Sequence, residues 1–241
     1  MRVSNDPGFA GASWQPYTTS LPWVLPIGDG AKSVFAQFRD AVGNVSLAVS
    51  APITLAETPP SAGTIALAGG APATNQQTVT ATLGATGATR MRLYVNGVAQ
   101  GADFVAYAAA ALVDLGLAPD ESTRTVSVVY RNAGGVDGGD ALATIVMDRT
   151  PPSAPLVLVA GGAAWSATTA VALSVSAQDG PATGTVASGL ASVEVANVAA
   201  FTGSATFAIA DTVAWTLAAG DGERVGDDQQ HGDDHGPGRH Q

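Results

Sequence analysis

The sequence contains no cysteine, a single lysine (Lys32), and no histidine outside residues 223–241. The lack of cysteine excludes disulfides and thiolate metal sites, and it leaves the redox compartment undetermined. Because every histidine lies in that last stretch, no Ser-His-Asp arrangement is expected in the rest of the chain. With 10 basic and 20 acidic residues, the chain also lacks the basic stripe that binding to nucleic acid or anionic membranes requires.

Long hydrophobic runs are missing as well. Met1–Asp6 contains no apolar stretch that could serve as a signal peptide. No run approaches the roughly 18 apolar residues of a membrane span. No glycine-rich loop lies between a strand pattern and a helix pattern, where it could hold phosphate. We therefore predict no membrane insertion, no cofactor and no enzymatic activity.

Short strands and turns are what the composition favours. The chain has 29 glycines and 14 prolines, and its apolar residues are mostly alanine and valine. Threonine and serine supply most of the polar positions. This mixture suits half-buried strands joined by turns, and it is poor material for long helices.

The chain repeats itself at two offsets. Residues 1–30 align without gaps onto residues 193–222, and nine of the 30 positions are identical. At an offset of 92, Thr58–Ala62 recurs as Thr150–Ala154. Fixed offsets of this kind indicate an array of repeated modules. The identical pairs are Val3/Val195, Asn5/Asn197, Phe9/Phe201, Gly11/Gly203, Trp23/Trp215, Leu25/Leu217, Gly28/Gly220, Asp29/Asp221 and Gly30/Gly222.

Residues 58–149 form one complete repeat in this interpretation. Seven short strand patterns are separated by turn signals, and Asn96-Gly97 predicts a hairpin because both of its turn residues need positive φ. Such a series predicts a two-sheet β-sandwich. Ala108–Ala111 suggests a short helical turn, although four alanines cannot nucleate a helix alone. The strand patterns cover Ile65–Ala68, Gln77–Leu83, Arg90–Val95, Phe104–Tyr107, Leu112–Leu117, Thr123–Arg131 and Ala141–Met147.

The other two copies match only part of the repeat. Residues 1–57 correspond to its later strands, ending with Ser33–Arg39 and Val45–Leu55, and residues 150–222 correspond to its earlier strands. We expect each truncated copy to expose part of an apolar face and an unpaired strand edge. Residues 223–241 then change abruptly to Asp, Gly, His and Gln, which predicts a disordered tail. The abrupt change suggests a reading-frame shift, with a natural polar tail as the alternative.

Several motifs together resemble a known family. They are Met1–Asp6, Trp14–Tyr17, Gly28–Gly30 and Phe35–Asp40, closed by Thr58-Pro59-Pro60. The combination resembles bacterial immunoglobulin-like (fibronectin type III-like) repeats, which occur in tandem in large exported and cell-surface proteins. The resemblance covers residues 1–222. It implies an all-β fold of tandem immunoglobulin-like β-sandwich repeats, one complete and two truncated, with an extracellular or cell-surface location.

The same resemblance implies a function without catalysis. Such repeats act as a spacer or an adhesive stalk, and their main partners are the neighbouring repeats of the parent polypeptide. The alternative is a carbohydrate- or protein-binding module, with a surface glycan or a protein as its partner.

Two acidic residues are candidate calcium ligands. Asp40 begins the loop between the strand patterns Ser33–Arg39 and Val45–Leu55, and Asp148 precedes a Thr-Pro-Pro junction. For Asp40 we favour an Asx turn in which Gly43 adopts positive φ. In the middle copy Asn132 replaces Asp40, and an amide lacks the charge that a calcium site needs.

Two aromatic residues are candidate ligand-binding groups, because Trp14 and Tyr17 could stack on a sugar. In the third copy the matching positions hold Thr206 and Ile209. This replacement favours packing for Tyr17 and leaves the role of Trp14 open. Asp29, between two glycines, is interpreted as a backbone cap in a tight connection.

Overall fold

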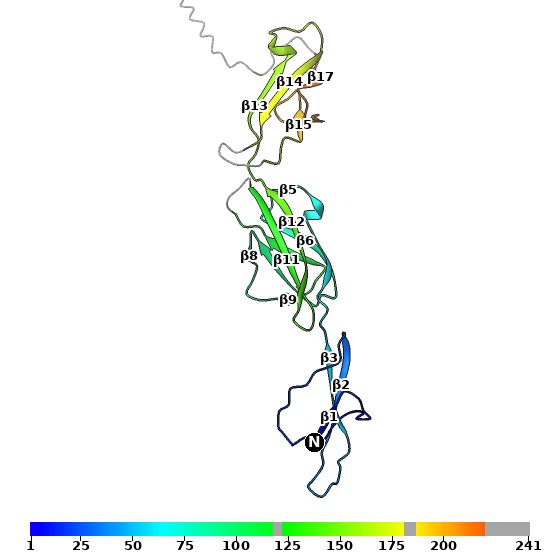
Figure 1. Ribbon diagram of the computed structural model, residues 1–241. Helices are drawn as coiled ribbons and strands as arrows, with labels where there is room; N and C mark the ends of the chain where they lie inside the picture. Colours follow the sequence, from blue (N-terminus) through cyan, green and yellow to red (C-terminus); the bar gives the residue numbers. More distant parts are fainter. Residues whose placement is uncertain (118–121, 181–186, 220–241) are drawn as a thin grey trace, which may run out of the picture. The chain divides into compact units, whose positions relative to one another are not determined.

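The computed structural model describes residues 1–117, 122–180 and 187–219 (Figure 1). These residues form β-strands, two short 3-10 turns and connecting loops, which confirms the predicted all-β class. Within the described ranges, no helix has the length and apolar character that crossing a bilayer would need. The predicted tail at 223–241 and the second Gly-Asp-Gly motif at 220–222 lie outside these ranges.

The described chain divides into two compact units. Unit 1 comprises Met1–Pro152 and Asp179–Gly189. Unit 2 comprises Ser153–Gln178 and the described residues from Leu190 onward. Each unit has its own buried cluster of apolar side chains.

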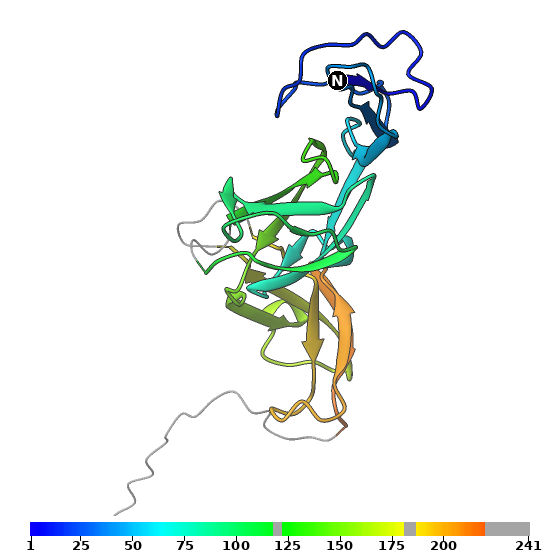
Figure 2. The ribbon, with the colours of Figure 1, turned by 90° about the horizontal axis from the view of Figure 1, so that it is seen from below.

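The middle segment of unit 1, residues 58–149, is a two-layer β-sandwich (Figure 2). One sheet has the order β10-β6-β4, and the other has the order β5-β12-β11-β7-β8, with β9 also paired to β7. The elements are β4 (Ser61–Leu67), η1 (Ala68–Gly70), β5 (Ala73–Thr74), β6 (Thr78–Thr86), β7 (Arg90–Val95), β8 (Val98–Ala99), β9 (Val105–Ala106), β10 (Ala110–Asp114), β11 (Ser122–Arg131) and β12 (Asp137–Met147).

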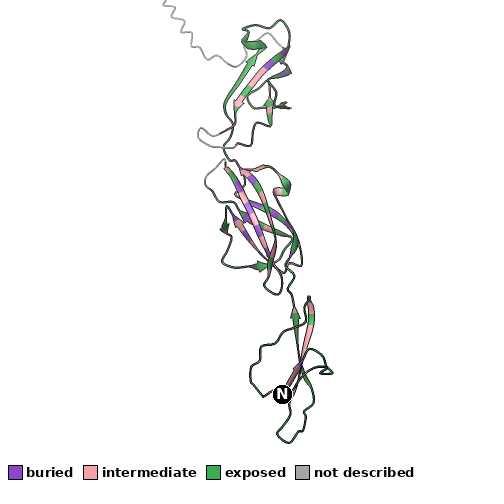
Figure 3. Cartoon of the chain, in the orientation of Figure 1, coloured by how far each residue is buried: buried purple, intermediate pink, exposed green. Residues whose placement is uncertain are grey.

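Alternating side chains explain why these strands bury one face. In β6, Val79, Ala81 and Leu83 are buried, while the threonines between them are exposed. Residues two apart on a strand share a face, so this pattern turns one face inward. Figure 3 shows that buried positions gather on the strands of the middle segment. Burying each large apolar side chain stabilises the fold by about 1.5–3 kcal/mol.

Two backbone features fix the geometry of this sandwich. Asn96 and Gly97 have φ values of 49° and 79° and close the hairpin between β7 and β8, as predicted. Strands β4 and β12 approach each other closely at Gly63 and Gly139. A Cβ atom added to Gly63 would lie 1.5 Å from the Gly139 carbonyl oxygen, so only glycine fits there.

The strand bounds differ from the sequence prediction at several ends. Strands β4 and β12 each begin four residues before the predicted Ile65 and Ala141. The largest change in type concerns the alanine run before β10. The helical turn considered at Ala108–Ala111 is wrong, because β10 begins at Ala110 and pairs with β6. This strand ends at Asp114, three residues before the predicted end. The Asp114 carboxylate accepts a hydrogen bond from the Gly116 N–H at 2.8 Å, and Gly116 has a φ of 76°, so the chain turns there.

The first segment of unit 1, residues 1–57, forms one antiparallel sheet of order β1-β2-β3. Its register repeats that of β7, β11 and β12. Val3 lies opposite Ala36, as Leu93 lies opposite Val128. The sheet therefore reproduces one layer of the sandwich. Its strands are β1 (Arg2–Ser4), β2 (Gly30–Gln37) and β3 (Val49–Leu55).

Unit 2 reproduces the other layer and one edge hairpin. A sheet of order β13-β14-β17 has the register of β4, β6 and β10, and β15 pairs with β16 as β7 pairs with β9. Its 3-10 turn repeats η1, with Ala160 at φ 49° where Ala68 has φ 47°. The elements are β13 (Ser153–Val159), η2 (Ala160–Gly162), β14 (Ala170–Gln178), β15 (Ser192–Val195), β16 (Ala205–Ala208) and β17 (Thr212–Thr216).

Candidate functional site

Three of the four predicted site residues meet at one hollow of the first segment. Trp14, Tyr17 and Asp40 line a cavity of about 380 Å³. The fourth, Asp148, is not part of this lining. The complete lining is Met1, Trp14, Gln15, Pro16, Tyr17, Arg39, Asp40 and Ala41.

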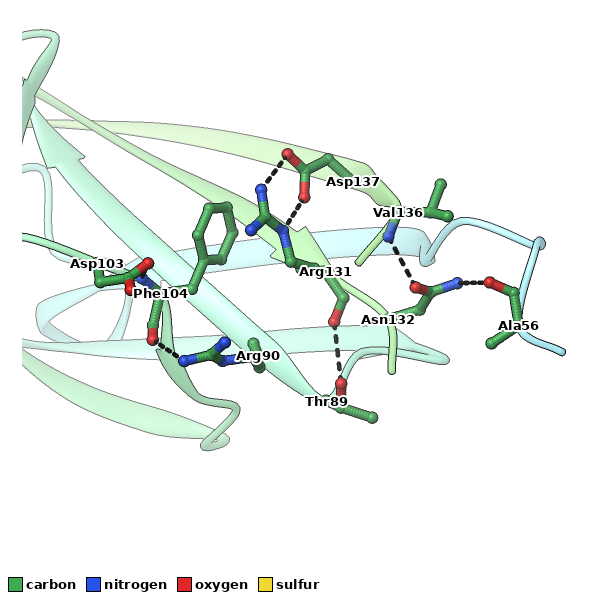
Figure 4. Close-up of polar contacts among 9 residues, drawn as sticks. All are labelled: Ala56, Thr89, Arg90, Asp103, Phe104, Arg131, Asn132, Val136 and Asp137. Atoms are coloured by element: carbon green, nitrogen blue, oxygen red, sulfur yellow. Dashed lines mark hydrogen bonds and ion pairs between the residues drawn. The ribbon is translucent and has the colours of Figure 1, made fainter. Parts of the chain in front are cut away.

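Trp14 is already in contact with charged side chains of its own sheet. The guanidinium carbons of Arg39 and Arg2 lie 4.6 Å and 5.0 Å from the ring centroid. Such cation–π contacts contribute about 0.5–1 kcal/mol at exposed sites. In the middle segment, Arg131 lies 3.7 Å from the ring of Phe104 in the same arrangement (Figure 4). The recurrence favours a packing role for Trp14.

Tyr17 also has a counterpart that packs. Its ring centroid lies 6.2 Å from that of Phe38, and the rings of Tyr107 and Tyr130 lie 5.9 Å apart at the matching positions. Tyr17 is nevertheless 68% exposed, whereas Tyr107 is half-buried. The difference arises because the Tyr107 hydroxyl reaches a carbonyl of β6, on the facing sheet.

Asp40 forms the Asx turn that the sequence predicts. One carboxylate oxygen accepts hydrogen bonds from the N–H groups of Val42 and Asn44, at 3.1 Å and 2.8 Å. The other oxygen accepts one from the Asn44 amide at 2.8 Å, and Gly43 has a φ of 99°. These bonds, with the Asn44 side chain contributing most, hold the pKa of Asp40 below its ordinary value. Both carboxylate oxygens of Asp40 therefore accept hydrogen bonds from N–H groups of the turn.

Asn132, the counterpart of Asp40, does more than close a turn. Its side-chain oxygen accepts a hydrogen bond from the Val136 N–H at 2.9 Å. Its side-chain N–H groups donate to the carbonyl oxygen of Ala56 at 3.0 Å (Figure 4) and to that of Thr58 at 2.8 Å. Only 5% of Asn132 is exposed. The middle segment thereby binds the chain that enters it.

Asp29 binds the same junction from the first segment. Its carboxylate accepts hydrogen bonds from the N–H groups of Glu57 at 2.6 Å and Thr58 at 3.2 Å. The Glu57 N–H is the largest cause of a lowered Asp29 pKa, followed by Thr58. Asp29 does bind backbone N–H groups, but its partners are at the junction, 28 and 29 residues away, and not in the tight connection where the sequence predicts the cap.

Asp148 lies at the following junction and is 7% exposed. Its carboxylate accepts hydrogen bonds from the N–H groups of Thr150 at 3.2 Å and Ser188 at 2.7 Å. Hydrogen bonding from Ser188 is the main cause of its lowered pKa. Among the described residues, no group of three or more His, Asp or Glu side chains is placed to hold a metal ion. The histidines of residues 223–241 lie outside the described ranges.

Sequence reasoning missed the arginine–aromatic pairs and the junction role of Asn132. A signal for the first was available. At an offset of 90, Trp14 and Tyr17 align with Phe104 and Tyr107, so aromatic residues recur in two copies. The Asn132 contact has no such signal, because its partners lie 74 and 76 residues away.

Comparison with known proteins gives a coarse likeness. No family model matches the sequence, and no curated protein matches it. One similar structure is a Corynebacterium diphtheriae protein described as membrane-anchored, with 16% identity and a TM-score of 0.32, over 62% of this chain and 40% of that one. Fibronectin(III)-like modules of Clostridium thermocellum CbhA show 16% identity and a TM-score of 0.35, over 61% of this chain and 76% of theirs. The chain thus spans less than half of the first structure.

Proposed function

We propose that this chain is a non-catalytic structural segment of a bacterial surface or secreted protein, in which immunoglobulin-like repeats act as spacers. The observation that supports this proposal is the junction at residues 56–58. Asp29 binds its N–H groups from one side, and Asn132 binds its carbonyl groups from the other. A linker whose donors and acceptors are both bound has less conformational freedom than a free one.

Proline adds to this stiffness. Pro59 and Pro60 follow directly, have fixed φ and cannot donate a hydrogen bond. A Cβ atom added to Gly134 would lie 2.2 Å from the Ala56 carbonyl oxygen, so the backbones are in direct contact there. A spacer holds its two ends at a fixed separation only when its joints are stiff, and this joint has the contacts of a stiff one.

Spin-label distance measurement on the full chain tests the proposal. The chain has no cysteine, so Leu47→Cys and Leu112→Cys give two unique label sites on exposed positions. We expect one narrow distance distribution, and a clearly broader one when Asp29→Ala and Asn132→Ala are added. Asp114→Ala is the matched control, since this carboxylate also caps backbone but lies away from the junction. An equally broad distribution without the junction changes would contradict a stiff spacer.

Glycan-array binding addresses the competing function. A saturable, sugar-specific signal from the full chain that Trp14→Ala removes would favour a carbohydrate-binding module. The contacts of Trp14 with Arg2 and Arg39 lead us to expect no such signal.

A further inference from the structure

The first segment leaves an apolar sheet face uncovered. Phe38 is 42% exposed and Ile53 is 53% exposed. Their counterparts at an offset of 92, Tyr130 and Ile145, are 0% and 1% exposed. In the middle segment this face is covered by the sheet of β4, β6 and β10. Among the described residues, no second sheet covers it in the first segment.

Unit 2 carries the type of sheet that would fit. Its order β13-β14-β17 and its register are those of β4-β6-β10. Part of its inward face is also open. Val157 and Val159 are 57% and 37% exposed, whereas Leu67, the counterpart of Val159, is 3% exposed. Unit 2 thus has one layer of a sandwich, and the first segment has the other.

Strand β15 of unit 2 offers an edge for pairing. Among the described residues it pairs with β16 alone. Its counterpart β7 pairs with β9 and β8 on one edge and with β11 on the other. The counterpart of β11 is β2, so the open edge of β15 matches β2 in direction and register.

The charges across the new pair of strands are complementary. Arg2 lies opposite Gln37, so Arg39, two residues further along, is its diagonal neighbour on the same face. Both guanidinium groups lie around Trp14. Glu194 of β15 occupies the place of Arg2 at the offset of 192. With β15 beside β2, a like-charged diagonal pair becomes the opposite-charged pair of Glu194 and Arg39.

We propose that two copies of this chain associate head to tail, with unit 2 of one copy completed by strands β2 and β3 of the other. Strand β15 takes the place of β1 beside β2, and the sheet β13-β14-β17 covers the face of Phe38 and Ile53. The contact joins two different surfaces, so it can propagate from copy to copy. It rests on the open faces and not on the junction at residues 56–58.

The structure also bounds the strength of this contact. The exchange gives up the three-residue pairing of β1 with β2 and the hydrogen bonds from the Arg2 guanidinium to the Gln37 side chain. At the offset of 92, Pro155 and Leu47 replace Gly63 and Gly139, so the closest approach of the middle sandwich cannot form. Association is therefore reversible and weaker than the packing inside the middle segment.

Sedimentation velocity of the full chain over a range of concentrations is the first test. Wild type forms dimers and larger species as concentration rises. Ile53→Asp and Val157→Asp each block one of the two surfaces, and each lowers the association constant by more than about 100-fold. An equimolar mixture of the two variants restores dimers but forms nothing larger, because one intact pair of surfaces remains. Leu112→Asp, on the exposed face of β10, is the control and associates as wild type does.

A charge exchange is the second test, and it changes only exposed side chains. Arg39→Glu and Glu194→Arg each weaken association by about tenfold, and the double variant restores it. The proposal is wrong if wild type stays monomeric at every concentration, either because one chain closes on itself or because chains do not associate. It is also wrong if association persists in both aspartate variants, or if a mixture of them stays monomeric.

Discussion

Ile145 and Ile53 occupy the same position in two copies of one strand pattern, yet 1% of one and 53% of the other is exposed. Both strands have apolar side chains at alternate positions, and β3 pairs with β2 in the register in which β12 pairs with β11. Strand β12 also pairs with β5 at its end, next to Ile145. The larger difference is the facing sheet, which covers Ile145 in the core of the middle segment. Burial is therefore a property of two layers together, and a strand pattern alone supplies only half of a core.

Truncation of the two isoleucines is expected to give the largest contrast. Ile145→Ala leaves a cavity and destabilises the middle segment by about 2–5 kcal/mol. Ile53→Ala costs less than about 1 kcal/mol, because half of that side chain is already in water. Hydrogen exchange of β11 and β2 peptides measures both, in the full chain at a dilution where it is monomeric. Equal loss of protection in the two segments would show that Ile53 is covered in solution.

Gly63→Ala is expected to have the next largest effect. It should destabilise the middle segment alone, because the first segment has no contact that matches that of Gly63 with Gly139. The new Cβ would overlap the Gly139 carbonyl, and overpacking of this kind costs about 1–3 kcal/mol. Gly8→Ala is the control, since its Cβ would be no closer than 3.3 Å to a flexible Asp6 oxygen. Urea unfolding followed by NMR of middle-segment amides should show a lower midpoint for Gly63→Ala alone.

Asn132→Ala compared with Asp40→Ala separates a junction residue from a turn residue. Loss of the Asn132 side chain leaves the Ala56 and Thr58 carbonyls without their amide donor, which costs about 1–3 kcal/mol. Asp40→Ala should cost less, because its partners are exposed N–H groups that water can bind. Thermal unfolding of the full chain checks the order. A larger shift for Asp40→Ala would reverse our assignment of the two roles.

The smallest effect is expected on titrating Asp29 with acid. Its pKa is lower in the folded chain than the ordinary 3.8, so its stabilising contribution is complete above that value. The contribution is lost as pH falls through the lowered pKa. The amide signals of Glu57 and Thr58 should therefore shift with a midpoint below pH 3.8. Asp29→Asn should remove that titration, and a midpoint above 3.8 would mean that the junction hydrogen bonds are absent.

The strands and the hairpin of this protein could be predicted from the sequence better than the contacts between its side chains. Alternation in β6 and the Asn96-Gly97 turn depend on neighbours in sequence, so the strands and the hairpin could be predicted locally. The buried Arg124 could not be, because an arginine among alternating residues is normally assigned to the surface. It is 1% exposed, and its Nε–H donates to the Leu115 carbonyl at 2.8 Å.

The candidate site shows the same division. The Asx turn at Asp40 was predictable because its donors lie within four residues. The sequence groups Trp14 and Tyr17 as candidate sugar-stacking residues, and the structure places both in the lining of one hollow with Asp40. Their packing against Arg39 and Phe38 depends on strand pairing across the sheet, which one copy of the sequence does not reveal.

The matched backbone of the copies has a genetic consequence. Ala62 and Ala154 both have positive φ, as do Phe9 and Phe201. Matching positions in the copies therefore adopt the same backbone conformation. Unequal recombination between two such copies, at any matching codon, yields a chain whose residues still fit the backbone conformation at each position. Whole repeats can then be gained or lost without remaking a fold. Under the proposed spacer function, the length that the repeats span would then change by one repeat at a time.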